Sequence, residues 1–259
     1  MIFTNDFLSA LILAIVQGLT EWLPISSSGH LLILERLLNY DGGLVFEVAL
    51  HFGTLMAVFI YFSKDITDIL RDLLRGRFST ENGRLGVLLL VGTIPAAIVG
   101  FLVKNYFDTI LSGIVVAGLG FMITGVLLLI VAFIPLKRND TVTWKKSLVI
   151  GTAQAVAILP SISRSGATIA SGVLLGLSEK TAMKFSFLLS IPAIMGASLV
   201  AGPASLSLDM VWGTIVSFAV GLATIHICFK YLLTRRENFK WFGIYALALG
   251  IVVLIWALV

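Results

Sequence analysis

Two segments of this chain repeat each other at an offset of 137 positions, and both place polar residues in apolar surroundings. The first is 14–33, AIVQGLTEWLPISSSGHLLI, and the second is 151–170, GTAQAVAILPSISRSGATIA. Each consists of two short apolar arms around a break of proline, serine and glycine. Such an arm is short for a bilayer crossing, which takes roughly 20 apolar residues. Two breaks in corresponding places of two halves predict a binding site at membrane depth.

The composition is that of an integral membrane protein. Mean hydropathy is +1.04. Only 12% of the residues are charged, whereas a soluble domain has about 25%. We therefore expect an all-α integral membrane protein with several long apolar helices. The windows interpreted as transmembrane helices are Leu44–Phe62, Leu85–Val103, Thr109–Ile134, Phe185–Leu208, Met210–Phe229 and Trp241–Val259.

Basic residues gather in four stretches between these windows, at 64–84, 137–146, 180–184 and 230–240. Together they hold 15 of the 18 lysines and arginines. The positive-inside rule assigns such stretches to the cytoplasm, so we expect both termini outside. The longest of them, Ser63–Arg84, mixes acidic and basic residues and is interpreted as a solvated cytoplasmic connection. Basic residues in membrane-flanking loops do not indicate a nucleic-acid partner.

The second repeated segment lies between two cytoplasmic stretches and must therefore leave the cytoplasm and return to it. Two full crossings would satisfy the charges, but short arms favour a re-entrant hairpin over 147–178. Its twin over 7–38 should enter from outside, because three crossings separate the two. We therefore predict one membrane domain, 1–259, built as an inverted-topology repeat of 1–134 and 135–259. Each half has one re-entrant helix hairpin and three transmembrane helices.

Ionisable residues inside membrane segments are costly and are functional candidates by default. Gln17 and Glu21 are four positions apart and share one face of the first arm. Ser27 and His30 share a face if the second arm is helical from Ser27. Arg164 takes the position in the second break that corresponds to Ser27. Glu21, Ser27, His30 and Arg164 are therefore the candidate catalytic residues.

Both breaks have the composition of an anion receptor. Serine and glycine at a helix start cap its free amides, and that end carries partial positive charge. The planar guanidinium of Arg164 suits phosphate oxygens. The residues expected to bind the substrate are Gln17, Ser26, Ser28, Gly29, Ser163, Ser165, Gly166 and Thr168.

Several chemical roles remain open at these residues. Ser27 could be a nucleophile with His30 or Glu21 as its base, or His30 or Glu21 could activate water. Glu21, with Gln17, could instead hold a divalent cation. A purely structural alternative has the serines break helices and Arg164 pair with Glu21. The gathering of four polar groups at the two breaks favours a catalytic site.

Three further polar residues could support this site. Glu47 and His51 are four positions apart on the next helix, and Gln154 is the counterpart of Gln17. Glu47 and His51 could alternatively line a polar seam.

At these residues the chain resembles the bacitracin-resistance family of undecaprenyl-diphosphate phosphatases. The first family motif corresponds to Gln17–Glu21 and continues into Leu23–His30, and the second corresponds to Pro160–Thr168. The resemblance spans essentially the whole chain. A second class, the type-2 phosphatidate phosphatases, is excluded because its distal histidine and aspartate would fall on Ala170 and Leu174.

The resemblance implies a multi-pass enzyme of the bacterial plasma (inner) membrane that recycles the lipid carrier of cell-wall synthesis. It implies removal of the terminal phosphate from undecaprenyl diphosphate, an active site open to the outer (periplasmic) face, and a requirement for Mg²⁺ or Ca²⁺. Glu21, Ser27, His30 and Arg164 would be its catalytic residues. Gln17 departs from the glutamate of many relatives, which weakens any scheme with two carboxylate metal ligands there.

A transporter or lipid flippase is the alternative function, because inverted repeats with broken helices are characteristic of secondary transporters. The cluster of serine, histidine and glutamate beside the receptor favours the enzyme. The expected partners are a polyprenyl diphosphate substrate and membrane lipid, and a homodimer remains open.

Overall fold

The computed structural model describes residues 5–103, 113–134, 138–201 and 207–258. Within these ranges every regular element is a helix, which confirms the all-α prediction. The first half contains α1 (Asn5–Thr20), α2 (Ser27–Leu38), α3 (Gly43–Tyr61), α4 (Ser63–Leu74), α5 (Glu81–Val103) and α7 (Ile114–Phe133). The second contains α8 (Trp144–Val156), α9 (Arg164–Leu174), α10 (Glu179–Ala201), α11 (Leu208–Ile227), η2 (Cys228–Leu232), η3 (Arg236–Asn238) and α12 (Phe239–Trp256).

Five described helical stretches are long and apolar enough to cross a membrane. They are Gly43–Tyr61, Glu81–Val103, Ile114–Phe133, Leu208–Leu232 and Arg236–Trp256. They correspond to five of the predicted windows, although 109–112 and residue 259 lie outside the described residues. The remaining window, Phe185–Leu208, falls largely on α10, which is not among the five, and 202–206 lie outside the described residues.

The predicted solvated connection over Ser63–Arg84 instead contains a helix, α4. Ile66, Ile69 and Leu73 recur at helical spacing, and this stripe packs toward the hydrophobic core. Ile69 and Leu73 contact α5 at Gly86. The abundance of charges in this stretch concealed an amphipathic pattern.

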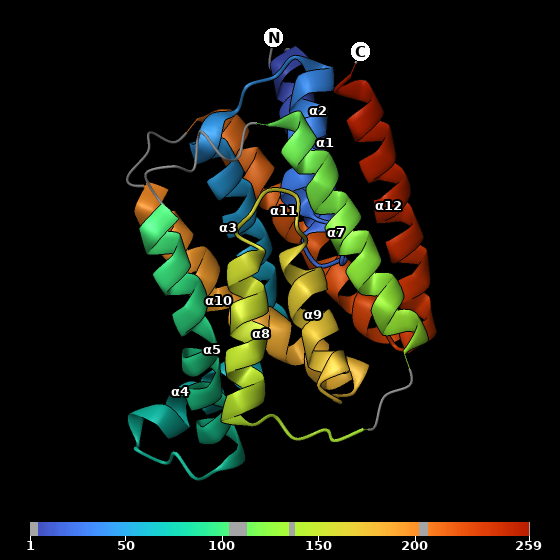
Figure 1. The fold of residues 1–259 in the computed structure, drawn as a ribbon. Coiled ribbons are helices and arrows are strands. Elements are labelled where there is room, and N and C mark those ends of the chain that lie inside the picture. Colours follow the sequence, from blue (N-terminus) through green and yellow to red (C-terminus); the bar gives the residue numbers. More distant parts are fainter. Residues whose placement is uncertain (1–4, 104–112, 135–137, 202–206, 259) are drawn as a thin grey trace.

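The repeated segments fold as two pairs of short helices. α1 and α2 have 16 and 12 residues, and α8 and α9 have 13 and 11. At the α-helical rise these lengths are roughly 17–24 Å, against about 30 Å for a hydrocarbon core. Figure 1 shows α1 and α2 occupying one end of the bundle and α8 and α9 the other, with both connecting turns near the middle.

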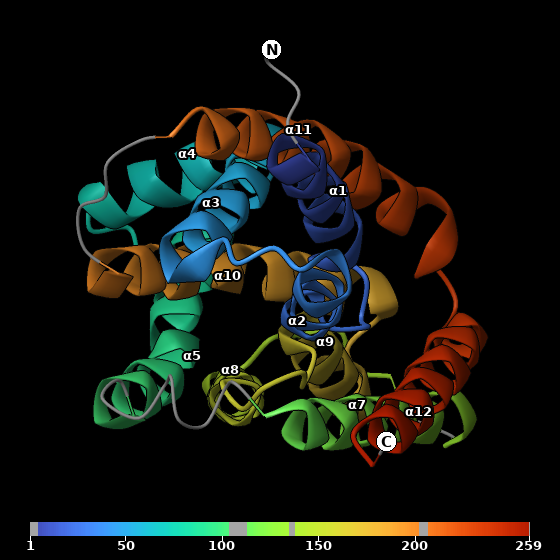
Figure 2. The ribbon, with the colours of Figure 1, turned by 90° about the horizontal axis from the view of Figure 1, so that it is seen from above.

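Long helices surround these short pairs (Figure 2). α1 packs against α11, α8 packs against α5, and α7 packs along α12. Two of these contacts are so close that they need glycine. A Cβ added to Gly151 would lie 2.1 Å from the Gly92 carbonyl oxygen, and one added to Gly125 would lie 2.8 Å from that of Gly243. The packing therefore holds both turns inside the protein.

Candidate active site

The two breaks meet in the middle of the bundle. Ser165 Oγ donates a hydrogen bond to the Leu23 carbonyl at 2.9 Å, which joins the second break to the first. The Ser163 amide donates to Thr124 Oγ1 of α7 at 3.0 Å. Residues more than 140 positions apart in the sequence are thus held against each other.

The short helices α2 and α9 begin with equivalent caps. Ser26 Oγ accepts from the Gly29 amide at 3.4 Å, and Ser163 Oγ accepts from the Gly166 amide at 3.0 Å. Each capping oxygen also lies within hydrogen-bond distance of the serine hydroxyl two residues later. Ser26 Oγ is 3.3 Å from Ser28 Oγ, and Ser163 Oγ is 3.2 Å from Ser165 Oγ. Because both helix starts face the same region, their partial positive charges converge there.

Glu21 is the centre of the polar cluster and is buried. Its Oε2 accepts hydrogen bonds from Ser27 Oγ at 2.6 Å and from Gln17 Nε2 at 3.1 Å. Its Oε1 is paired with Arg164 Nη2. His51 Nε2 lies 3.5 Å from Oε2. The carboxylate therefore contacts a hydroxyl, an amide, a guanidinium and an imidazole.

Arg164 has one guanidinium nitrogen in use and one free. Nη2 pairs with Glu21, whereas Nη1 is buried and has no hydrogen-bond partner. The guanidinium carbon lies 5.6 Å from the ring centroid of Trp22, which is itself fully buried. A buried donor without a partner is costly. Nη1 is therefore a ready binding point for an anionic oxygen.

A cavity of about 610 Å³ opens beside this cluster. Its lining includes the polar residues Glu21, Ser27 and Arg164 and the apolar residues Ile158 and Ile194. The other predicted site residues that line it are Ser26, Ser28, Glu47, His51, Ser163 and Ser165. The cavity lining thus combines polar and charged groups with apolar side chains.

His30 lies elsewhere in the structure. It is not among the cavity-lining residues, and its Nδ1 lies 2.6 Å from the Ser26 carbonyl oxygen. Its Nε2 lies 2.7 Å from the Tyr245 hydroxyl, and its ring packs edge-on to Phe121 at 5.2 Å. If Nδ1 carries the proton, Nε2 accepts from Tyr245. Both ring nitrogens are therefore engaged by groups other than Glu21.

The remaining predicted residues do not line the cavity. Thr168 Oγ1 lies 2.6 Å from Ser186 Oγ and donates to the Arg164 carbonyl at 2.8 Å. Gly29 and Gly166 provide the capped amides. Gln154 is buried, and neither atom of its side-chain amide has a partner.

Sequence reasoning missed two acidic residues that line the cavity, Glu35 and Asp41. A signal for Glu35 was present, because Ser28, Leu32 and Glu35 follow helical spacing and all three line the cavity. Asp41 follows the left-handed turn at Asn39, where no helical pattern applies. Ser161, in the second break, also lines the cavity and has a positive φ of 58°.

Comparison with known proteins extends over almost the whole chain. The family model described as "Bacitracin resistance protein BacA" matches residues 10–252. The chain belongs to this family. A protein named undecaprenyl-diphosphatase from Chromohalobacter salexigens is 39% identical, over 97% of this chain and 99% of the relative. Proteins of the same name from Korarchaeum cryptofilum (38% identical, 96% and 98%) and Idiomarina loihiensis (41% identical, 88% and 91%) are also similar.

The predicted metal ligands of this family member, Glu21 and Gln17, have surroundings that bear on metal binding. Both Glu21 oxygens already contact donors, and Gln17 Oε1 is buried without a partner. Among the described residues, no group of three or more His, Cys, Asp and Glu side chains is arranged to hold a metal ion. As arranged, Glu21 and Gln17 do not form a metal site. The requirement for Mg²⁺ or Ca²⁺ stays a prediction.

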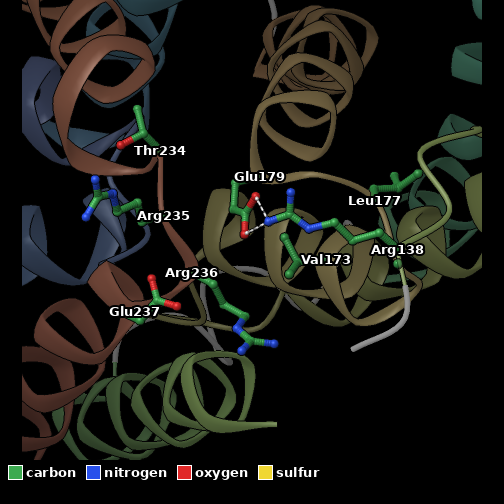
Figure 3. A pocket seen from close by; sticks show the side chains of 9 residues that line it. Arg138, Val173, Leu177, Glu179, Thr234, Arg235, Arg236 and Glu237 are labelled. Atoms are coloured by element: carbon green, nitrogen blue, oxygen red, sulfur yellow. Dashed lines mark hydrogen bonds and ion pairs between the residues drawn. The ribbon is translucent and has the colours of Figure 1, made fainter. Parts of the chain in front are cut away.

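A smaller cavity, of about 240 Å³, lies near the start of α10 and the η3 turn (Figure 3). Arg138 reaches across it to Glu179, with Nη2 3.3 and 3.4 Å from the two carboxylate oxygens. Arg236 donates to the Ile134 carbonyl at 2.6 Å. Within the described ranges, no buried side-chain polar atom that lacks a partner belongs to this cavity. It therefore lacks the free buried donor that marks the larger cavity.

Proposed function

We propose that this membrane protein hydrolyses undecaprenyl diphosphate to undecaprenyl phosphate and inorganic phosphate. The reaction returns the lipid carrier to bacterial cell-wall synthesis and thereby confers resistance to bacitracin. One observation carries the mechanism: Arg164, whose buried Nη1 has no partner, lines the same cavity as Ser27, whose hydroxyl donates to Glu21. An anion clamp beside an activated hydroxyl is what phosphoryl transfer needs.

In the first step, Arg164 Nη1 and the capped helix starts hold the terminal phosphoryl group. Ser27 Oγ attacks its phosphorus while its proton passes to Glu21 Oε2, which already accepts that hydrogen bond at 2.6 Å. The Oγ–P bond forms, and the bond from phosphorus to the bridging oxygen breaks. Undecaprenyl phosphate leaves with the electron pair of that bond.

In the second step, water attacks the phosphorus of the phosphoserine. The Oγ–P bond breaks, Ser27 Oγ recovers its proton from Glu21, and both protons of the water leave with inorganic phosphate. Direct attack by water that His30 or Glu21 activates is the alternative route. A phosphoserine trapped at Ser27 would decide between them.

The proposed architecture is an inverted-topology repeat of 1–134 and 135–259, with re-entrant hairpins α1–α2 and α8–α9; residues 135–137 lie outside the described ranges. Three observations support it. The caps Ser26 and Ser163 correspond at the offset of 137. The hairpins occupy opposite ends of the bundle (Figure 1). The packing of α1 on α11 is mirrored by that of α8 on α5.

The proposed orientation has both termini outside and the cavity open to the outer face. The helix starts of α8, α10 and α12, which lie near the basic stretches, are at the end opposite the start of α1 (Figure 1). By the positive-inside rule that end is cytoplasmic. The α2–α3 connection lies at the opposite end (Figure 1), and it contributes Asp41 to the cavity lining.

The apolar side of the cavity is the proposed seat of the first isoprene units. Ala157, Ile158 and Leu159 line it from the second break, and Ala193 and Ile194 line it from α10. Leu159 is 48% exposed, so this wall continues to the lipid-facing surface. The rest of the prenyl chain would leave the cavity there.

Phosphate release from undecaprenyl diphosphate by the purified protein in nanodiscs tests the proposal. Wild type and Arg138→Ala, which changes the arginine of the smaller cavity, should both release phosphate. Arg164→Ala should lose roughly 100-fold or more of the rate. Assays with EDTA and with added Mg²⁺ or Ca²⁺ test the metal requirement. Folded wild-type protein that translocates the lipid without hydrolysing it would overturn the proposal in favour of a transporter.

A further inference from the structure

Helix α4 differs from the long apolar helices in position and in character. It lies at the end of the bundle opposite the start of α1, packed on α5 (Figure 1). Figure 2 shows it at the periphery of the molecule, running across a view taken from above the bundle. Ile69 is buried, and Leu73 packs beside it on the core side.

A second apolar edge of this segment is exposed. Leu70 is 52% exposed, Leu74 is 88% exposed, and Phe78, in the following turn, is 57% exposed. Leu70 and Leu74 are one helical turn apart and share a face. Such neighbouring exposed apolar side chains indicate an interaction surface.

The charges around this edge are unevenly matched. Two carboxylates of the segment are paired with cations within the protein, Asp65 with Lys184 at 2.6 Å and Asp68 with Arg71 at 3.0 Å. A third, Asp72, keeps its charge and accepts a hydrogen bond from Thr80 at 2.7 Å. In contrast, Lys64, Arg75 and Arg77 make no ion pair within the described part of the chain. The edge therefore presents cationic groups next to exposed leucine and phenylalanine.

We propose that this surface, defined as Leu70, Leu74, Arg75, Arg77 and Phe78, docks on the acidic phospholipids of the adjacent leaflet. Apolar side chains on one edge enter the boundary between headgroups and acyl chains, while the arginines bind lipid phosphates. The long arginine side chains can reach the headgroups while the neighbouring exposed leucines insert among the acyl chains. The charge favours acidic lipid over a neutral bilayer surface.

The docking surface would position α4 at the membrane, and it takes no part in the reaction. It lies outside both cavities, since none of its residues lines either of them. It rests on the membrane location of the chain but on no catalytic step. A nanodisc offers the same lipids on both faces, so a test there does not depend on the proposed orientation either.

A nitroxide label on Leu74→Cys tests the docking in nanodiscs made of phosphatidylcholine alone or mixed with phosphatidylglycerol. Ser79→Cys, at an exposed polar position of the same turn, is the matched control. Cys228 is buried, so labelling of the wild type measures the background. In acidic discs, the label at position 74 should collide with a water-soluble nickel reagent roughly fivefold less than the label at 79.

Charge reversal separates lipid docking from simple burial. Arg75→Glu combined with Arg77→Glu should return the label at 74 to the nickel accessibility of neutral discs. Lys180→Glu, which reverses an exposed charge on another helix, should leave it unchanged. Equal accessibility at 74 and 79 in acidic discs would overturn the proposal. So would shielding that is the same in neutral discs and insensitive to the double reversal, as expected of a protein partner.

Discussion

The two breaks share a backbone design but divide the chemistry between them. Each begins its second helix with a serine cap and a glycine amide, at corresponding positions. The side chains around those caps differ. The corresponding positions are Gln17 and Gln154, Glu21 and Ile158, Ser27 and Arg164, and His30 and Ala167.

This division follows from electrostatics. A carboxylate at both breaks, or a guanidinium at both, would bring like charges together at a buried position. One acidic and one basic break instead neutralise each other and leave a donor free, as the Glu21–Arg164 pair does. Gln17 donates to Glu21, whereas Gln154 faces no such acceptor because Ile158 stands at the corresponding position. The two copies thus share a backbone arrangement, while only the first carries the serine proposed as nucleophile.

The largest expected effect is the loss of Ser27, the proposed nucleophile of the first break. Ser27→Ala should lower kcat about 10⁴-fold, because groups that act as one unit fail together when one is removed. Phosphate release at saturating substrate measures it. Ser28→Ala, at the adjacent cavity-lining serine, is the control and should cost only a few-fold. Near-normal turnover in Ser27→Ala would assign the attack to water.

Arg164→Lys tests the role of the second break in phosphate binding. Lysine keeps the charge but cannot pair with Glu21 and hold a phosphate through a planar fork at the same time. The rate should fall roughly 100- to 1,000-fold. Thermal unfolding in the same detergent checks that the variant remains folded. Wild-type turnover at normal stability would remove the guanidinium from the phosphate-binding step.

Much of the site geometry was accessible to sequence reasoning because the repeat supplied long-range information. Matching serines and glycines predicted two turns that face each other, and the structure brings Glu21, Ser27 and Arg164 together. Their catalytic roles stay predictions. Residue spacing alone could not show whether His30 or His51 lies beside Glu21. The direction of the His30 ring depends on Tyr245, which is 215 positions away in the sequence.

The fold, like the site, could be predicted only in part from the sequence. Long apolar helices were predictable from composition, because nothing but a helix satisfies the backbone of such a stretch in lipid. α4 was missed, because its apolar stripe of Ile66, Ile69 and Leu73 is embedded among charges. Its helical period carries the signal that its composition conceals.

The histidines should separate activity from stability. His51→Gln should lower kcat roughly 100-fold, because His51 lines the cavity and its Nε2 lies 3.5 Å from Glu21 Oε2. His30→Gln should mainly lower the thermal midpoint, since it alters contacts with Tyr245 and Phe121. Steady-state kinetics and thermal scans on both variants measure the contrast. A larger kcat loss in His30→Gln at unchanged stability would instead support the role predicted from sequence.

The smallest effect concerns the caps, where the same substitution should act differently at corresponding positions. Ser26 has a φ of 69°, which favours glycine, and its cap bond is long at 3.4 Å. Ser163 has an ordinary φ of −63° and a bond of 3.0 Å. Both substitutions lose a serine cap and add freedom to the unfolded chain, but only Ser26→Gly also relieves backbone strain. Ser163→Gly should therefore be less stable than Ser26→Gly by about 1 kcal/mol, read from thermal midpoints in one detergent. Equal midpoints would mean that the two turns are energetically equivalent despite their different backbones.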